Sequence, residues 1–411
     1  MKQTVVIAGV GMTRFGKHLD RSLKSLAGEA IAEAMQDAGI TASDLQAAYM
    51  ANAAASVITG QICIPGQIIL REMGIGRIPV VNVENACASA STAFNQACNM
   101  ISAGAYDVVL ACGYEKLYHP DKQKTFSVFT GSVDVENLDN IKKAVQMRMA
   151  EVRPGAHLQG SGTDRSLFMD IYAAAALTHM KQHGTTREQF AMVSVKNSVH
   201  GSLNARAQFQ EVLTLEEVLE AREITWPLTL PMCSPVGDGA AAVVLLSRKK
   251  ARELAVRKRV KVLASVLGGG WEYAEGESEH VTAFCARQAY EAAGIGPEDL
   301  HCAEVHDACA PAEVVLYEEL GFCPTGGGGR FVELGHSRLG GSLPVNTSGG
   351  LLRKGHPIGA TGIAQIVELT AQLQGRAGKR QVKKAKLALA ENGGGFIGSD
   401  VAAVCVSILG R

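Results

Sequence analysis

The chain has 411 residues, of which 47% are hydrophobic and only 5% aromatic, and its 40 basic and 40 acidic side chains cancel to zero net charge. This length suits two domains of ordinary size or one large duplicated unit. A neutral chain offers no electrostatic case for binding nucleic acid or an anionic membrane surface. No apolar run reaches the ~18–20 residues of a membrane-spanning helix.

The cysteines and the N-terminus predict the compartment. Ten cysteines are scattered through mostly apolar segments, without a CxxC pair. This usage is typical of reduced thiols and not of a disulfide framework. The opening residues MKQTVVIAGVG lead directly into a strand, with no charged region before an apolar signal. We therefore expect a cytoplasmic protein.

The chain repeats itself. The segment AIAEAMQDAGITASDLQAAYMANA, residues 30–53, matches CARQAYEAAGIGPEDLHCAEVHDA, residues 285–308, and Ala-Gly-Ile falls at 38–40 and again at 293–295. Each copy has the pattern of an amphipathic helix, a glycine stop, a capped turn and a strand. The repeat predicts two related α/β halves.

Cys87 follows the first candidate for a buried strand. Residues 79–83 form a β-branched run, and a small-residue helix is expected to begin at about Cys87. The positive end of a helix dipole and unpaired N–H groups favour a thiolate, which predicts a pKa below the free value of ~8.5. The alternative is a buried structural cysteine.

Residues 120–226 break the α/β pattern. The first part is polar and poorly periodic, and helices are expected at about 168–183 and 187–200.

Two histidines and a glycine run follow in the second half. His306 ends a short strand in EVHDACAPAEVV, and His356 lies in NTSGGLLRKGHPIGATG, a glycine-punctuated turn that opens a long helix. The segment LALAENGGGFIG contains Gly393, whose backbone N–H can approach a developing oxyanion. A cysteine, a base and an oxyanion donor are the groups that nucleophilic acyl transfer needs.

A metal site is the competing interpretation of part of this region. His301, Cys302, His306 and Cys309 have ligand types that suit zinc. Their spacing matches no finger or ribbon pattern, and we expect no metal.

These four blocks, in this order, resemble the thiolase family over the whole chain. The closest likeness is to sterol-carrier-protein-type (non-specific lipid-transfer-type) thiolases and acetyl-CoA acetyltransferases. It rests on the pair His306-Asp307, on NARAQF at 204–209 and on PVGDGAAAVVLLS at 235–247. The resemblance implies an α/β fold of two duplicated βαβαβαββ halves in a five-layered αβαβα body, with an added loop domain.

The same resemblance divides the chain. Residues 1–119 with 227–260 would form the half that holds the nucleophile, 120–226 the loop domain that covers the site and holds CoA, and 261–411 the half that holds the histidines. Candidate partners for the CoA phosphates are Arg148, Arg153, Lys196 and Arg206, among which the sequence does not decide.

The implied activity is CoA-dependent acyl transfer that cleaves or forms the C–C bond of a β-ketoacyl-CoA through an acyl-enzyme on Cys87. His356 would move the thiol proton, and His306 would hydrogen-bond the thioester oxygen. The N–H groups of Cys87 and Gly393 would form an oxyanion hole. Asn346 and Asp307 would orient the histidines or a water molecule. Coenzyme A is a co-substrate, and no permanent cofactor is expected.

The chain departs from the family at the second acid–base group. The cysteine that one branch places before the glycine run is Glu391 here, and the His-Asp-Cys motif of the sterol-carrier branch is His-Asp-Ala, with Cys309 next. Glu391 could replace the missing cysteine if burial raises its pKa. Cys309 is expected to fill the core.

This departure leaves three interpretations: a thiolase, an aldolase-like relative without an acyl-enzyme, and a non-catalytic subunit that binds acyl-CoA or lipid. Retention of Cys87, His306 and His356 favours the first. The resemblance further implies a homodimer or tetramer and a possible partner subunit of zinc-ribbon/OB-fold type. The acyl group is left open.

Overall fold

The computed structural model describes residues 3–256, 260–273, 279–398 and 400–411. Its strands are β1 (Val5–Met12), β2 (Ala47–Ala51), β3 (Val80–Val83), β4 (Val108–Glu115), β5 (Glu223–Thr225), β6 (Leu228–Thr229), β7 (Gly239–Ser247), β8 (Val260–Gly269), β9 (Cys302–Glu304), β10 (Leu387–Ile397) and β11 (Asp400–Gly410).

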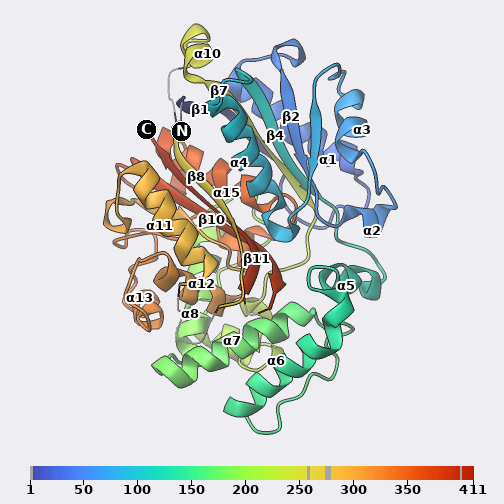
Figure 1. The fold of residues 1–411 in the computed structure, drawn as a ribbon. Coiled ribbons are helices and arrows are strands. Elements are labelled where there is room, and N and C mark those ends of the chain that lie inside the picture. Colours follow the sequence, from blue (N-terminus) through green and yellow to red (C-terminus); the bar gives the residue numbers. More distant parts are fainter. Residues whose placement is uncertain (1–2, 257–259, 274–278, 399) are drawn as a thin grey trace.

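Helices separate many of these strands along the chain, and runs of several helices lie between β4 and β5 and between β9 and β10 (Figure 1). They are α1 (Leu23–Ala38), α2 (Ala55–Thr59), α3 (Pro65–Glu72), α4 (Ser89–Ser102), α5 (Lys122–Thr130), α6 (Leu138–Val152), α7 (Leu167–His183), α8 (Arg187–Ser202), α9 (Leu215–Glu220), α10 (Arg248–Glu253), α11 (Val281–Ala293), α12 (Ala310–Glu319), α13 (Gly328–Glu333), α14 (Gly350–Lys354) and α15 (Thr361–Gln374). The helices expected at 168–183 and 187–200 correspond to α7 and α8.

In the described chain, nine strands form one mixed sheet in the order β3-β2-β4-β7-β1-β8-β11-β10-β9. The first five belong to the first half of the fold and the last four to the second. The two halves join where β1 pairs with β8 over three residues. The third strand of the second half is reduced to a single bridge between Ala303 and Val345.

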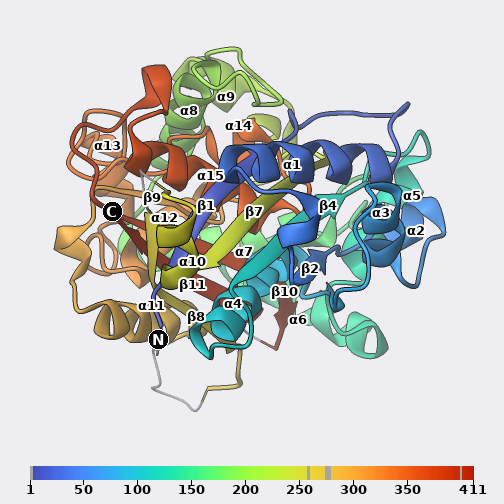
Figure 2. The ribbon, with the colours of Figure 1, turned by 90° about the horizontal axis from the view of Figure 1, so that it is seen from above.

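Helices α4 and α15 lie between the two halves of the sheet. Each contacts strands of both halves, whereas α1 and α3 cover the outer face of the first half and α11 covers that of the second. In Figure 2, α1 and α4 lie on opposite sides of strands β1, β7 and β4. The order helix, sheet, helix, sheet, helix is the expected five-layered body. Most side chains between the layers are Ala, Val, Leu and Ile, and such small residues allow the layers to approach closely.

The sequence repeat corresponds to one repeated structural unit. Helix α1 ends at Gly39 with φ 67°, and α11 ends at Gly294 with φ 69°. Only glycine adopts this left-handed conformation without steric cost. A short capped turn then leads into β2 in the first copy and β9 in the second.

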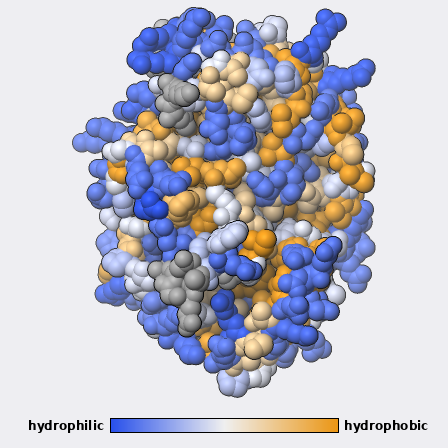
Figure 3. All heavy atoms as spheres, in the orientation of Figure 1, coloured by the Kyte–Doolittle hydropathy of each residue, from blue (hydrophilic) through white to orange (hydrophobic). Residues whose placement is uncertain are grey.

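Helices α5 to α8 form a helical region beside one end of the sheet, at the bottom of Figure 1. Helix α7 packs against α12 of the second half, and α8 packs against α12 and α14. The helical region of α5 to α8 therefore packs against the elements that follow β9. Polar side chains cover most of the face in Figure 3, with smaller hydrophobic patches between them. In the described part of the chain, no helix is long and apolar enough to cross a membrane.

Candidate active site

Cys87 lies in a single 3₁₀ turn, Ala86–Ala88, between β3 and α4. The turn is held by its own polar groups: Ala86 has φ 47°, and its N–H donates to the Glu84 carboxylate at 2.5 Å. The Ser89 hydroxyl donates to the Ala86 carbonyl at 2.6 Å. These contacts place the thiol beyond the N-terminal end of α4, in agreement with the expected strand–cysteine–helix order. The expectation of a buried strand was wrong, because β3 is an edge strand whose residues are exposed or half-buried.

The glycine run passes directly against this turn. A Cβ atom on Gly394 would lie 2.3 Å from the Asn85 carbonyl oxygen, so only glycine fits there. Gly393 lies in β10 opposite Val404 and lines the same cavity as Cys87. The run is thus part of a strand, and its lack of side chains lets β10 approach the turn that carries Cys87.

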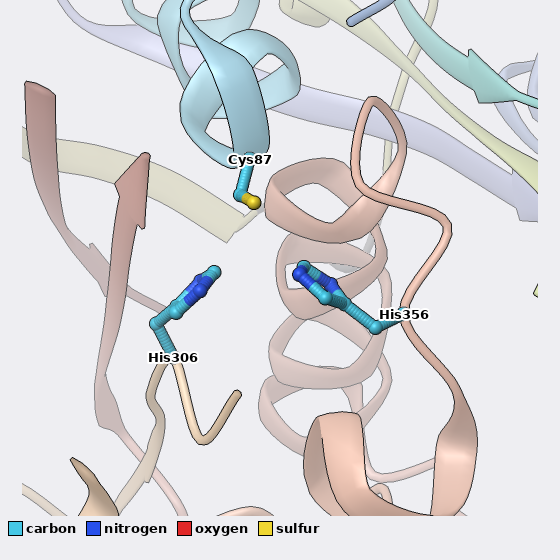
Figure 4. Close-up of side chains that lie close together, drawn as sticks. All are labelled: Cys87, His306 and His356. Carbon is cyan, nitrogen blue, oxygen red and sulfur yellow. The ribbon is translucent and has the colours of Figure 1, made fainter. Parts of the chain in front are cut away.

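Both predicted histidines converge on Cys87 (Figure 4). The imidazole rings of His306 and His356 are perpendicular, with centroids 5.1 Å apart. One ring nitrogen of each and the Cys87 sulfur lie within 4.8 Å of one another. His306 follows β9, and His356 precedes α15, so three separate junctions of the two halves meet at one point.

Hydrogen bonds assign different tautomers to the two rings. The Asn392 amide donates to His306 Nδ1 at 2.8 Å, so a neutral His306 carries its proton on Nε2. The Thr361 hydroxyl donates to the Pro357 carbonyl and therefore accepts from His356 Nδ1, at 2.8 Å. The Nε2 atom of His356 is then a free acceptor. One ring can donate a hydrogen bond at Nε2, and the other can accept a proton there.

The electrostatics of the resting site differ from the sequence prediction. Burial, with a further contribution from the charge of Glu115, raises the pKa of Cys87 to about 12, instead of lowering it. Burial lowers the pKa of His306 to about 4 and that of His356 well below its ordinary value. Burial of the site outweighs the helix terminus, because the low-dielectric surroundings disfavour every charged form. At neutral pH all three groups are uncharged.

Glu391 lies beside the histidines and lines the cavity. Its carboxylate accepts from the backbone N–H of His306 at 2.9 Å. Burial raises its pKa to about 8, as the sequence analysis required of a substitute acid. A group with this pKa is mostly protonated at pH 7 and can donate a proton.

Asp307 and Asn346 hydrogen-bond the backbone near His356 and His306, not the imidazole rings themselves. Asp307 is fully buried and accepts from the N–H of Leu351 at 2.7 Å, which fixes the start of α14 ahead of His356. Asn346 accepts from the N–H of Val305 at 2.9 Å and so holds the strand end before His306. Neither side chain hydrogen-bonds a histidine ring in the described structure; each fixes the backbone that carries one.

Three supporting residues were absent from the sequence prediction. Asn392 and Thr361 set the histidine tautomers, and Glu115 accepts from the N–H groups of Ala54 and Gly359, at 3.2 and 3.0 Å. Burial raises the pKa of Glu115 to about 7. Asn392 and Thr361 lie inside motifs already selected, within two and five residues of Gly393 and His356. Only its tertiary contacts with Ala54 and Gly359 distinguish Glu115 from an ordinary acidic residue at the end of a strand.

The candidate phosphate ligands differ in availability. Lys196 is buried and bonded to Glu313 and to the Val345 carbonyl, and Arg206 pairs with Glu33, so neither is free for CoA. Arg153 lies over the Trp226 ring. Arg148 lines the cavity and pairs with no acid in the described residues, as does Arg222, which the sequence analysis did not select.

The four residues considered as zinc ligands, His301, Cys302, His306 and Cys309, do not form a cluster in the described structure. Cys302 and Cys309 are buried core residues, as expected for Cys309. Among the described residues, the histidine, cysteine and acidic groups close enough to share an ion are Cys87, His306 and His356.

The reacting groups face a cavity of about 670 Å³. Its walls come from both halves and from the loop region, and aromatic rings of Phe126, Phe129, Phe168 and Phe396 contribute to them. This volume falls in the range of pockets that enclose drug-sized ligands. The site can therefore surround a thioester far larger than an acetyl group.

Comparison with known proteins agrees with this geometry. Residues 5–218 match the N-terminal domain of thiolases, and residues 278–410 match the thiolase C-terminal domain-like family. The chain belongs to the thiolase family, and its homologues indicate an acyltransferase enzyme.

Two curated relatives are similar over nearly the whole chain. An acetyl-CoA acetyltransferase of Methanothermobacter thermautotrophicus is 37% identical over 96% of this chain and 97% of its own length. Sterol carrier protein 2 of Bos taurus is 35% identical over 95% of this chain and 70% of its own length. A solved structure described as an Ltp2-ChsH2(DUF35) aldolase has a TM-score of 0.77 at 25% identity and covers 99% of this chain and 98% of its own.

Proposed function

We propose that the protein transfers acyl groups to and from coenzyme A through a thioester on Cys87, and that it cleaves or forms the C–C bond of a β-ketoacyl-CoA. The observation that carries the proposal is the meeting of Cys87 with two neutral imidazoles of opposite tautomer. A thiol beside a free imidazole acceptor is a nucleophile with its base, and the second imidazole is a donor for the developing oxyanion.

In the first step, His356 Nε2 takes the Cys87 proton as the sulfur attacks the β-keto carbonyl. The oxyanion receives hydrogen bonds from backbone N–H groups, for which those of Cys87 and Gly393 are the candidates. The Cα–Cβ bond then breaks, and its electron pair forms the enolate of the departing acyl-CoA. His306 Nε2–H donates to that thioester oxygen, and a proton from Glu391 completes the shorter acyl-CoA.

In the second step, the thiol of free CoA attacks the acyl-enzyme. Between the two steps His356 releases to solvent the proton it took from Cys87, and Glu391 regains one from solvent, so both groups are again neutral. His356 then removes the CoA thiol proton and gives it to the Cys87 sulfur as that sulfur leaves. Because the resting groups are neutral, base catalysis by His356 forms the thiolate only as the bond to the substrate forms.

The test is the mass of the intact protein after brief incubation with acetyl-CoA and with acetoacetyl-CoA, followed by peptide mapping. We expect one acetyl group on Cys87, absent from Cys87→Ala and unchanged in Cys63→Ala, which alters an exposed thiol. Acylation of Cys87→Ala, or an unmodified wild type with every thioester tried, would refute an acyl-enzyme on Cys87.

An aldolase reaction is the second candidate, favoured by the similarity to a solved aldolase and by Glu391 in place of a cysteine. It predicts C–C cleavage without acylation of Cys87 and release of a carbonyl product. The same mass measurement, combined with product analysis, separates the two reactions.

We further propose a homodimer in the cytoplasm that works with a smaller zinc-ribbon/OB-fold partner. Strand β3 is the outer strand of the sheet, and its Val81 is 44% exposed, so it can pair with a second copy. The ten free cysteines suit a reducing compartment. Light scattering of the purified chain tests the dimer, and full thiolase activity without any added protein would argue against the partner.

A further inference from the structure

The cavity continues well beyond Cys87 along one face of α12. Pro311, Ala312, Val315, Leu316 and Glu319 all line it. These positions recur every three to four residues and so form one stripe of the helix. With a rise of 1.5 Å per residue, the eight steps from Pro311 to Glu319 span about 12 Å. Helix α12 begins four residues after His306, so this stripe leads away from the reacting groups.

Helix α7 forms the opposite wall. Tyr172, Ala175, Ala176 and His179 line the cavity at helical spacing. His179 Nε2 bonds the Glu318 carboxylate at 3.0 Å, which ties this part of α7 to the end of α12. The two alanines keep space between the helices. The result is a channel, bounded by α7 and α12, that leads from the catalytic groups towards Glu319.

The hairpin of β10 and β11 gives a second measure of the channel length from the catalytic groups to Glu319. Gly393 lies beside the reacting groups, and Ile397, four residues on, pairs with Asp400. At ~3.4 Å per residue this distance is about 14 Å. Asp400 lines the cavity and contributes to the raised pKa of Glu319, so the hairpin and α12 end near each other.

The far end of the channel is polar. The Thr282 side chain hydrogen-bonds Glu319, whose pKa burial raises to about 7. Asp400 accepts from the Tyr273 hydroxyl and from the Val281 N–H, at 3.1 Å for the latter. No cation pairs with the Glu319 carboxylate in the described residues. An acyl group that fills the channel therefore ends against an acceptor.

Charge distinguishes this end from the path of CoA. Phosphates are repelled by the carboxylates of Glu319 and Asp400 but attracted by Arg148 and Arg222, which line the same cavity without an acidic partner in the described residues. We therefore assign these two arginines to the CoA phosphates and the space between α7 and α12, which ends at Glu319, to the acyl group.

We propose that this channel selects acyl groups about 12 Å long that end in a hydrogen-bond donor, a hydroxyl or an ammonium, with Glu319 as the acceptor. The proposal rests on the thiolase-type function proposed above. It deepens that function by naming the substrate class. Above pH 7, where Glu319 is mostly ionised, its charge rejects an end group that is a carboxylate. A methyl end offers no hydrogen bond and leaves the Glu319 carboxylate with Thr282 as its donor.

Binding to Cys87→Ala protein tests the channel without chemistry. Three acyl-CoA thioesters of equal length, ending in methyl, hydroxyl or carboxylate, are compared by calorimetry at pH 8, above the pKa of Glu319. We expect the hydroxyl to bind about tenfold more tightly than the methyl and the carboxylate about tenfold more weakly. Added Glu319→Gln should abolish the penalty on the carboxylate, and Glu319→Leu should abolish the advantage of the hydroxyl. Glu291→Gln, an exposed position on α11, is the matched control and should keep the wild-type order.

Equal affinity for the three thioesters, or an unchanged order in Glu319→Leu, would overturn the channel assignment. Because this readout is a Kd, it is independent of acyl-enzyme formation. The mass measurement on wild type decides the proposed function separately, so failure of one is distinguishable from failure of the other.

Discussion

The charge state of Cys87 gives the sharpest test of the site. With a thiol pKa of about 12, the thiolate fraction is about 10⁻⁵ at pH 7, against about 3% for an ordinary thiol with a pKa of ~8.5. Alkylation requires the thiolate. Raising the pH from 7 to 9 should therefore speed alkylation of Cys87 about a hundredfold, with no plateau, because the pH stays far below the pKa.

The assay is timed reaction with iodoacetamide, quenched and mapped peptide by peptide. Cys63 is exposed and serves as an accessible internal reference in the same sample. At pH 7 Cys87 should react roughly a thousandfold more slowly than a free thiol. A rate for Cys87 that is independent of pH between 6 and 9 would refute the reasoning, because it would reveal a preformed thiolate–imidazolium pair in the resting enzyme.

Three further changes separate the roles of neighbouring residues. Glu391→Gln removes the proposed acid, so thiolysis of acetoacetyl-CoA should fall at least about a hundredfold. Acetyl exchange between acetyl-CoA and CoA should continue; equal losses in both assays would contradict the assignment. Asn392→Ala frees the His306 ring and should lower kcat about tenfold or more with little change in melting temperature; unchanged kcat would remove Asn392 from the site. Lys354→Met leaves the buried Glu304 carboxyl without its ion-pair partner, which should cost about 3–5 kcal/mol in urea unfolding, and added Glu304→Gln should restore part of it.

The comparison of sequence and structure is clearest at the three junctions. Short-range patterns predict several elements: the strand before Cys87, helices α7 and α8, and the repeated α1–β2 and α11–β9 units. They can do so because glycine stops, caps and apolar spacing act within a few residues. Cys87, His306 and His356 were selected by type and motif, and the folded chain brings them within 4.8 Å. Glu391 was chosen for a pKa that burial would raise, and burial raises it.

The failures have a common cause. The prediction for the Cys87 pKa considered the helix terminus alone, which is local, whereas the pKa depends on how many protein atoms surround the thiol. Lys196 was a candidate for phosphate binding until the fold placed it against Glu313 inside the protein. Burial of both groups depends on contacts between residues far apart in the chain.

The sequence by itself determined the family, the two α/β halves and the internal repeat, and it selected Cys87, His306 and His356 as the candidate catalytic residues. Only the tertiary structure decided the protonation of the site, the tautomers set by Asn392 and Thr361, and the channel that ends at Glu319. The physical reason is the distance along the chain over which each kind of interaction acts. Backbone preferences and motifs are encoded in neighbouring residues, but solvation, charge and cavity shape depend on the packing of α7, α12 and the β10–β11 hairpin, which come from distant parts of the chain.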